Sequence, residues 1–302
     1  MRFHDLDLNL LVALDTLLVE RNTLRAGQKL NLSQSAASSA LARLRDHFKD
    51  PLLVQVGRNL VPTPRALELA PVIRSILMQI EGRVLTKSEF NPATSTRNFR
   101  IVASDYAAMV ALGRGLTAVS RLAPNMRFEI SPVNTGPAIA LERGDVDLLI
   151  MPDVFTSQDH PRVTYFSDRY VCIVSSDHPE VGATLPFDQY LALPHAIVRF
   201  SNGQQSTFED WFVERYGHAR IIELVTGTHA SLPYFVAQSR RIATVHERHA
   251  LMVSRTLPLK IVPAPLDIPR INEVIQWHRM NDGDEALAWL RQCLIETESG
   301  AA

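Results

Sequence analysis

Residues 31–48 read NLSQSAASSALARLRDHF, and this stretch decides the fold of the N-terminal part of the chain. Ser33 is a good N-cap because its hydroxyl can accept a hydrogen bond from an unpaired N–H group of the first helical turn. The apolar positions after it have helical spacing and predict one buried face of a helix that runs to about Phe48. These positions are Ala37, Ala40, Leu41, Leu44 and Phe48.

The opposite face of this helix carries small hydroxyl side chains with arginines beside them. At about 100° per residue, Ser35, Ser39 and Ala42 point away from the core, with Ser38 and Arg45 on one flank and Arg43 on the other. Such a face can approach the floor of a DNA groove, where hydroxyls read base edges and arginines reach phosphates. A serine-rich face that is simply solvated is the alternative.

The surroundings of the helix favour the DNA interpretation. Residues 6–20 have the leucine spacing of one helix, and Asn22 or Thr23 can cap a second helix that ends at Leu30. Residues 21–65 contain eight Lys and Arg residues against two Asp residues, a balance of +6. Two short helices joined by a tight turn inside a basic block predict a helix-turn-helix.

Composition bounds the remaining possibilities. The 302 residues carry a net charge of −1 and are 46% hydrophobic, which predicts two folded domains and excludes a disordered chain. The N-terminus lacks the apolar run of a signal peptide, and no apolar stretch is long enough to cross a membrane, so we expect a cytoplasmic protein. The two cysteines, Cys172 and Cys293, are far apart in sequence, which disfavours a disulfide scaffold; a peroxide-sensing pair is the alternative.

Residues 52–64 predict a wing and the start of a long helix. Two apolar runs around Gly57-Arg58-Asn59 indicate a β-hairpin whose tip carries Arg58 toward DNA. Thr63 and Pro64 are typical of an N-cap and a first helical residue. The helix then presents a coiled-coil seam, which we expect to pair with a second copy of the chain; packing on its own effector domain is the alternative. The seam consists of Leu69, Ile73, Ile76 and Ile80.

The period of the sequence changes after a polar linker at residues 88–97. Strands alternate with helices from Phe99 onward, which predicts an α/β region of two lobes. Residues 144–151 form a turn into a fully apolar strand, as in a parallel sheet that is covered on both faces. A helix is expected from about Ser104 to Arg121, and later strands near 170–174, 195–199, 221–225, 241–245, 260–263 and 272–278.

Residues 1–90 resemble the N-terminal domain of LysR-type transcriptional regulators. The resemblance rests on Leu6–Leu11, on Asn31–Ser38, on Leu41–Arg45 and on Val61–Ala66. The opening MRF..LDLNLLVALD, the FNPA linker and RGDVDLLIMPD are similar to the NodD-like branch, which includes nodulation regulators and regulators of aromatic catabolism. The resemblance covers nearly the whole chain and weakens after residue 180.

The resemblance implies an α/β multi-domain protein in three parts. These are a winged helix-turn-helix DNA-binding domain (1–63), a dimerisation linker helix (64–88), and an effector-binding domain (89–302) that is similar to type 2 periplasmic binding proteins. Its first lobe would comprise about 95–166 and 266–302, and its second about 167–265. The resemblance also implies a dimer of dimers on double-stranded promoter DNA, with RNA polymerase as a partner.

Two residues depart from the family pattern. Ser35 stands where the family usually has proline, which adds a possible hydroxyl contact to DNA. The operator sequences of other family members are therefore a weaker guide to the operator of this protein. Gly27 stands where alanine is usual, and we expect it to cost the second helix up to about 1 kcal/mol. The expected DNA contacts are Thr23, Gln34, Ser35, Ser38, Ser39, Arg43 and Arg58.

Ligands of open α/β lobes bind beyond the carboxyl ends of strands. Applied to the predicted strands, this rule selects Ser104, Asp105, Tyr106, Met151, Phe200, Ser201, Thr228, His229 and His246, with Pro152 beside Met151. Aromatic and thioether walls with hydroxyl and imidazole donors suit a small aromatic or phenolic inducer, and flavonoids, salicylate-like acids and hydroquinone-type phenols all fit. Each histidine taken alone is as well explained by a structural role.

Enzyme classes find no support in the motifs. The chain has no GxSxG elbow, HExxH or Walker loop, and His246-Glu247-Arg248-His249 has the wrong spacing for HExxH. We therefore expect no catalytic residues, no metal and no cofactor other than the inducer. The sequence predicts a DNA-binding transcriptional regulator, an activator by its branch, and the rival class is a small-molecule binding protein without DNA function.

Overall fold

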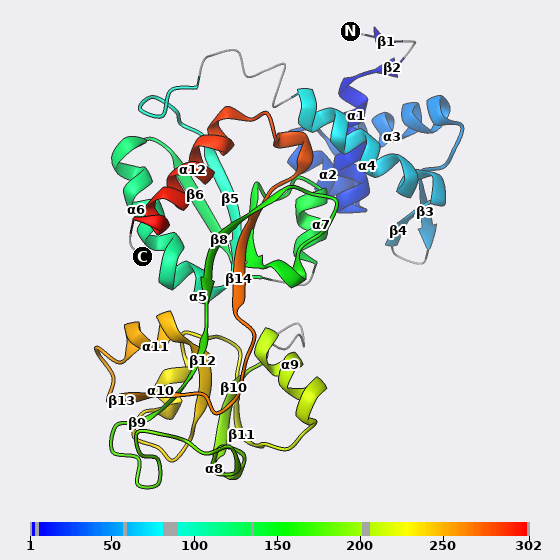
Figure 1. Cartoon of the computed structure of the whole chain (residues 1–302). Helices are drawn as coiled ribbons and strands as arrows, with labels where there is room; N and C mark the ends of the chain where they lie inside the picture. The colour runs from blue at the N-terminus through cyan, green and yellow to red at the C-terminus, as the bar shows by residue number, and fades with distance from the viewer. Residues whose placement is uncertain are drawn as a thin grey trace. The chain divides into compact units, whose positions relative to one another are not determined.

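The computed structural model describes residues 2–3, 6–56, 59–80, 90–133, 136–200 and 206–300. The chain divides into two compact units, Met1–Glu89 with Glu142–Gly144, and Phe90–Leu141 with Asp145–Ala302. Among the described residues, the first unit has one hydrophobic core and the second has several. Figure 1 shows the order of the elements along the chain.

The N-terminal unit is built on three helices that follow a short antiparallel pair, β1 (Arg2–Phe3) and β2 (Leu6–Asp7). The helices are α1 (Asn9–Glu20), α2 (Thr23–Lys29) and α3 (Gln34–Phe48). Asn22 caps α2, so Thr23 is its first helical residue. Ser33 caps α3 as predicted, and its hydroxyl accepts a hydrogen bond from the N–H of Ala36 at 3.1 Å.

Gly27 has a packing role that the sequence did not reveal. The N–H of Leu32 donates to the Gly27 carbonyl at 2.8 Å, which closes the turn between α2 and α3. A Cβ atom at position 27 would lie 3.0 Å from the Leu32 carbonyl oxygen and 3.3 Å from backbone atoms of Ser33. The expected cost in helix propensity is therefore offset by a tighter turn than alanine would permit without a shift of the backbone.

A two-stranded wing follows α3, as predicted. The strands β3 (Leu53–Val56) and β4 (Asn59–Pro62) are antiparallel, and Leu53 lies opposite Pro62. The guanidinium of Arg45 donates to the carbonyl oxygens of Pro51 at 2.8 Å and Leu53 at 2.7 Å. Arg45 therefore fixes the base of the wing against α3.

The helix α4 (Pro64–Gln79) begins with Thr63 as its N-cap, as predicted, but its seam differs from the expectation. Ile73 is 3% exposed in the core of its own unit, and Leu69 packs against the same core. Neither a second copy nor the effector domain covers these two positions: α1 of the same unit packs against α4, and Arg74 forms an ion pair with Asp15 at 2.6 Å. Ile76 is 38% exposed and Ile80 is half-buried.

The second unit begins with a lobe built on a five-stranded sheet in the order β6-β5-β7-β14-β8. Its strands are β5 (Asn98–Ala103), β6 (Arg127–Ser131), β7 (Leu148–Pro152), β8 (Arg162–Asp168) and β14 (Ile271–Gln276). The strands β6, β5 and β7 are parallel, but β14 is antiparallel to both β7 and β8. The sheet is mixed rather than parallel, and β8 is a strand that the sequence analysis missed.

Helical segments pack against this sheet. They are α5 (Asp105–Ala107), the π-helix η2 (Ala108–Leu112), α6 (Gly113–Leu122), α7 (Pro137–Glu142), the 3-10 helices η3 (Asp153–Phe155) and η4 (Arg279–Asn281), and α12 (Glu285–Ser299). The helix expected from Ser104 to Arg121 thus contains a π-helical turn, and Ser104 is its N-cap. At Gly115, α6 comes so close to α12 that a Cβ atom would lie 2.6 Å from a methyl carbon of Leu294.

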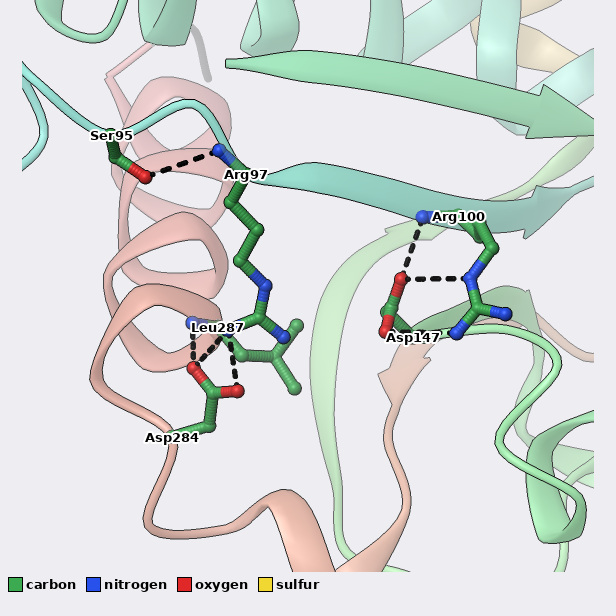
Figure 2. Close-up of polar contacts among 6 residues, drawn as sticks. All are labelled: Ser95, Arg97, Arg100, Asp147, Asp284 and Leu287. Carbon is green, nitrogen blue, oxygen red and sulfur yellow. Dashed lines mark hydrogen bonds and ion pairs between the residues drawn. The ribbon is translucent and has the colours of Figure 1, made fainter. Parts of the chain in front are cut away.

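Two aspartates fasten the edges of this lobe (Figure 2). Asp284 caps α12 through the N–H of Leu287 at 3.0 Å and also pairs with Arg97, which precedes β5. Asp147, at the start of β7, accepts a hydrogen bond from the N–H of Arg100 at 2.7 Å. The single carboxylate of Asp284 therefore joins the C-terminal helix to the entry of the first strand of the sheet.

The second lobe contains two smaller sheets with four helices. Its strands are β9 (Tyr170–Ser175), β10 (Pro194–Val198), β11 (Ile221–Thr226), β12 (Ala243–His246) and β13 (Leu259–Pro263). Its helices are α8 (Phe187–Ala192), α9 (Thr207–Tyr216), α10 (Leu232–Val236) and α11 (Glu247–Val253). The strand β9 lies between β12 and β13, and a bridge between His195 and Ile242 joins β12 to the parallel pair β10-β11.

The chain passes between the lobes twice. Only Arg169 separates β8 in the first lobe from β9 in the second, and residues 264–270 return from β13 to β14. The strands β8 and β14 pair along their length and run side by side toward the second lobe (Figure 1). Within the ranges that the structure describes, we find no helix long and apolar enough to cross a membrane.

We expect Asp284→Ala to lower the free energy of unfolding by about 2 kcal/mol, because the substitution removes a helix cap and the partner of Arg97. Asp284→Asn keeps a capping oxygen and should cost roughly half as much. Urea denaturation of the two variants measures the difference. Equal losses for alanine and asparagine would show that the cap contributes nothing.

Candidate functional site

A cleft of about 470 Å³ lies between the two lobes of the second unit. This volume includes the open space at the mouth of the cleft. The first lobe contributes Ser104, Tyr106, Val133, Met151, Pro152, Phe155, Ile271 and Glu273, and the second contributes Phe200, Ser206, Thr207, His229 and His246. A ligand in this cleft would touch both lobes at once.

Six of the nine residues expected to bind the effector line this one cleft: Ser104, Tyr106, Met151, Phe200, His229 and His246. Asp105 and Thr228 are not among its lining residues. The Asp105 carboxylate instead accepts a hydrogen bond from the N–H of Ala230 at 2.8 Å, and the Thr228 hydroxyl bonds to that of Ser231 at 2.8 Å. Ser201 lies outside the described residues.

The ends of strands bring the six together. Ser104 and Tyr106 follow β5, Met151 lies at the end of β7, Phe200 follows β10, His229 follows β11, and His246 ends β12. These strands carry their side chains to the edges where the two lobes meet, which is the usual position of ligands in open α/β sheets.

Aromatic rings form one wall of the cleft. Tyr106 stacks on His246 with their ring centroids 3.9 Å apart, and His229 lies edge-on to Phe200 at 5.8 Å. The Tyr106 hydroxyl donates to the Asp168 carboxylate at 2.6 Å, where β8 leaves the first lobe. Tyr106 is thereby held in place against His246.

The ionisable groups of the cleft are uncharged near neutral pH. Burial lowers the pKa of His246 well below its usual value, and the neighbouring His229 and His249 lower it further. Burial also lowers the pKa of His229 and brings that of His249 to about 4. Burial raises the pKa of Glu273 to about 8, with a contribution from Asp153. The histidines and Glu273 therefore offer hydrogen-bonding groups without a net charge.

Seven of the described lining residues were not among the expected effector contacts. One of the seven, Pro152, had been noted only for its position beside Met151. The most informative of them is Glu273, which is 1% exposed. One signal could have found it: Glu273 is the only acidic residue of Ile271–Gln276, a strand that is otherwise mostly apolar. Val133, Phe155, Ser206, Thr207 and Ile271 lie on or beside loops and carried no such signal.

The recognition face of α3 is exposed, as its pattern indicated. Gln34, Ser35, Ser38 and Ser39 all lie on the solvent side of the helix, and Arg43 follows on the same side. The Ser35 hydroxyl is 2.9 Å from that of Ser33, which ties it to the cap of the helix. Thr23 is half-buried at the start of α2.

Of the two arginines expected to contact phosphates, only Arg43 is described, and its side chain is already paired. The Arg43 guanidinium, half exposed, lies 3.2 Å from the Asp7 carboxylate, so DNA would have to compete with this pair or share the arginine with it. Pairs at such exposed positions stabilise a protein by only about 0–1 kcal/mol, so the competition is slight. Arg58 lies outside the described residues.

A winged helix-turn-helix in one unit and a cleft between two lobes in the other define a class of protein, the DNA-binding regulator that responds to a small molecule. Comparison with known proteins makes the assignment definite. Residues 8–67 match the bacterial regulatory helix-turn-helix protein model of the LysR family, and residues 93–299 match the LysR substrate binding domain. The chain belongs to the LysR family of transcriptional regulators, and it is a DNA-binding regulator rather than an enzyme.

Individual relatives support this assignment over the full length. The chain is 41% identical to Nodulation protein D 1 of Mesorhizobium japonicum, over 99% of this chain and 95% of that protein. A probable transcriptional regulator from Pseudomonas aeruginosa, of known structure, is 28% identical with a TM-score of 0.65, over 98% of this chain and 97% of the other. A full-length OxyR variant from the same organism shares the fold, with a TM-score of 0.75 at 17% identity, over 98% of this chain and 95% of the other.

The raised pKa of Glu273 predicts a pH-dependent stability. The folded chain keeps this proton up to about pH 8, whereas the unfolded chain releases it near the ordinary value of 4.5. Since the folded state binds more protons between these values, the contribution of Glu273 to the free energy of unfolding falls as pH rises. Glu273→Gln should therefore gain stability over wild type from pH 5 to pH 8, by at most about 1.4 kcal/mol per pH unit.

Thermal and urea unfolding of both proteins across this range measure the gain. The lowered pKa values of the cleft histidines act in the opposite direction, but they are common to both proteins and cancel in the difference. Glu129→Gln, at an exposed position on β6, is the control for loss of a carboxyl. A Glu273→Gln gain that does not change with pH would contradict the assignment of an uncharged Glu273.

Proposed function

We propose that this regulator binds a small aromatic inducer in the cleft and activates transcription when the cleft is occupied. The observation that carries the proposal is the cleft itself, whose six predicted residues come from both lobes and surround one space. Flat rings match the stacked Tyr106 and His246, and the remaining walls are mainly apolar. Similarity to Nodulation protein D over the full chain supports an activator.

A ligand changes DNA binding only through a different affinity for two arrangements of the protein. Contact with both lobes supplies that difference, because movement of one lobe toward the other closes the walls around the ligand. We expect the inducer to alter how the regulator bends or occupies its promoter more than whether it binds there. The rival interpretation, a small-molecule binder without DNA function, is excluded by the family match over residues 8–67.

Assembly and partners are part of the same proposal. Two copies would pair through the exposed edge of α4, where Val72 and Ile76 are 56% and 38% exposed, and two such dimers would occupy the promoter. A two-fold dimer places its two α3 helices on successive half-sites of double-stranded DNA. RNA polymerase would then be the partner at the promoter, in the cytoplasm.

DNA binding through α3 is tested by two substitutions that should behave differently. Arg43→Ala should weaken binding to all sequences and reduce the slope of log affinity against log salt by about one unit, the loss of one phosphate contact. Ser38→Ala should change the discrimination among operator variants instead. Arg121→Ala, exposed on α6, is the control for loss of positive charge. If neither α3 variant changes binding, the helix does not enter the groove.

Calorimetry of the full chain with flavonoids, benzoates and hydroquinones tests the inducer. Ser104→Ala and His229→Ala should each weaken binding of any ligand found, because both residues line the cleft. Thr228→Ala is a matched control, since Thr228 is next to His229 but not among the lining residues. A ligand that binds all three variants like wild type occupies another site, and binding of no aromatic at all would refute the aromatic inducer.

A further inference from the structure

Two polar side chains of the cleft have buried atoms without a hydrogen-bond partner. Glu273 is 1% exposed, and its Oε2 atom has no partner among the described residues. His246 is 4% exposed, and both of its ring nitrogens lack a partner within the same described ranges. Leaving a buried polar atom unpaired costs about 1–3 kcal/mol. Three such atoms in one cleft indicate groups that a ligand would satisfy.

The sheet holds Glu273 at this position from both sides. Glu273 lies opposite Pro152 of β7 and Phe166 of β8, and the register between β14 and β8 shifts immediately after it. The shift leaves Tyr165 as an extra residue on β8. Such bulges re-aim a side chain and are common beside functional sites. Backbone pairing therefore sets the position of Glu273 in the sheet.

The groups around Glu273 favour its uncharged form. Asp153 interacts unfavourably with a charge on Glu273, and such a charge would in turn raise the pKa values of Tyr106 and Tyr170. His246 stacks on Tyr106, lies tilted against Tyr170 and is itself held neutral by burial. The described residues that line the cleft with Glu273 include no Lys or Arg.

The absence of a cation extends to the rest of the lining. None of the thirteen described lining residues is Lys or Arg. The adjoining segments 134–135 and 201–205, which the structure does not describe, contain neither residue in their sequence. Burying an ionised carboxylate without a positive partner is strongly unfavourable, more so beside Asp153.

We propose that Glu273 is the residue that selects the charge of the ligand: its neutral carboxyl, together with His246, hydrogen-bonds an uncharged hydroxyl or amide group at the buried end of the aromatic ligand and excludes aromatic carboxylates. The Glu273 O–H donates to the ligand oxygen, and the ligand donates its own hydrogen to an imidazole nitrogen of His246. This inference rests on the proposed function, because it requires an aromatic ligand in the cleft. The proposed role of Glu273 distinguishes phenols, which the cleft would bind, from benzoates, which it would exclude. The shape of the cleft alone does not distinguish these two classes of ligand.

Three probes of one shape test it: 2-naphthol, 2-naphthamide and 2-naphthoate, titrated by calorimetry into the full-length protein near neutral pH. We expect 2-naphthol and 2-naphthamide to bind at least about tenfold more tightly than 2-naphthoate, the equivalent of one lost hydrogen bond or more. Glu273→Ala should weaken 2-naphthol about tenfold, whereas Glu273→Gln, which stays neutral and keeps its shape, should remain within about threefold of wild type.

A pH series gives a second readout that needs only the glutamine variant. Affinity of wild type for 2-naphthamide, which does not titrate, should fall as pH rises through about 8, because Glu273 then loses the proton that it donates. Affinity of Glu273→Gln should not change over the same range. The groups that face Glu273, namely Asp153, Tyr106, Tyr170 and His246, are present in both proteins, so the difference between them reports Glu273.

The outcomes separate this inference from the proposed function. Binding of 2-naphthoate as tightly as 2-naphthol, or a wild-type affinity that follows Glu273→Gln at every pH, would overturn the role of Glu273 while leaving an aromatic ligand in the cleft. If none of the three probes and no member of the wider aromatic panel binds, the proposed function fails and this inference fails with it.

Discussion

The antiparallel pairing of β8 with β14 is the constraint on which the second unit depends. Both passages of the chain between the lobes start or end on this pair, so the two strands set where the lobes meet and what faces the cleft. Asp168 ends β8 and receives hydrogen bonds from the Tyr106 hydroxyl and the N–H of Arg248, which belong to different lobes. Glu273 lies in β14, beside the register shift. The pairing of β8 with β14 thus positions three features of the cleft: the anchor of Tyr106 at Asp168, the passage of the chain between the lobes, and Glu273.

Under the proposed function, this arrangement would let a cleft without charges control a DNA-binding unit. Hydrogen bonds between uncharged groups in a buried site are lost when the site opens to water, so their contribution differs between a closed and an open arrangement of the lobes. Tyr106 and His246 belong to opposite lobes and stack on each other, so the two lobes are already in contact at this wall of the cleft. Under the proposed function, ligand recognition and lobe movement would therefore use the same residues.

The sequence predicted those parts of the molecule that local chemistry determines. Ser33 and Thr63 cap helices where the pattern placed them, and the residues after the strand ends converge because strand ends meet at one edge. The exposed face of α3 followed from the spacing of its alanines and leucines. Family resemblance supplied the division of roles between the units, which no spacing of residues could have given.

The failures concern contacts that are distant in sequence. Ile73 was expected to face a second copy because nothing near it in sequence shows that α1 would cover it or that Asp15 would pair with Arg74. The strand β8 was missed, and with it the mixed sheet, because its polar ends hide a short apolar run. Glu273 was not selected from the sequence. Its burial follows from the position of β14 between β7 and β8, which the sequence does not show. Burial of a charge depends on the whole sheet.

The most direct test of an uncharged polar cleft is the infrared difference spectrum of wild type minus Glu273→Gln. Near neutral pH it should contain the C=O stretch of a protonated carboxylic acid, and this band should give way to carboxylate bands as pH rises well above about 8. Addition of 2-naphthol near neutral pH should shift the band, because the carboxyl acquires a hydrogen-bond partner. Carboxylate bands alone in the neutral spectrum would contradict the account, since Glu273 would then be ionised and the cleft would be anionic.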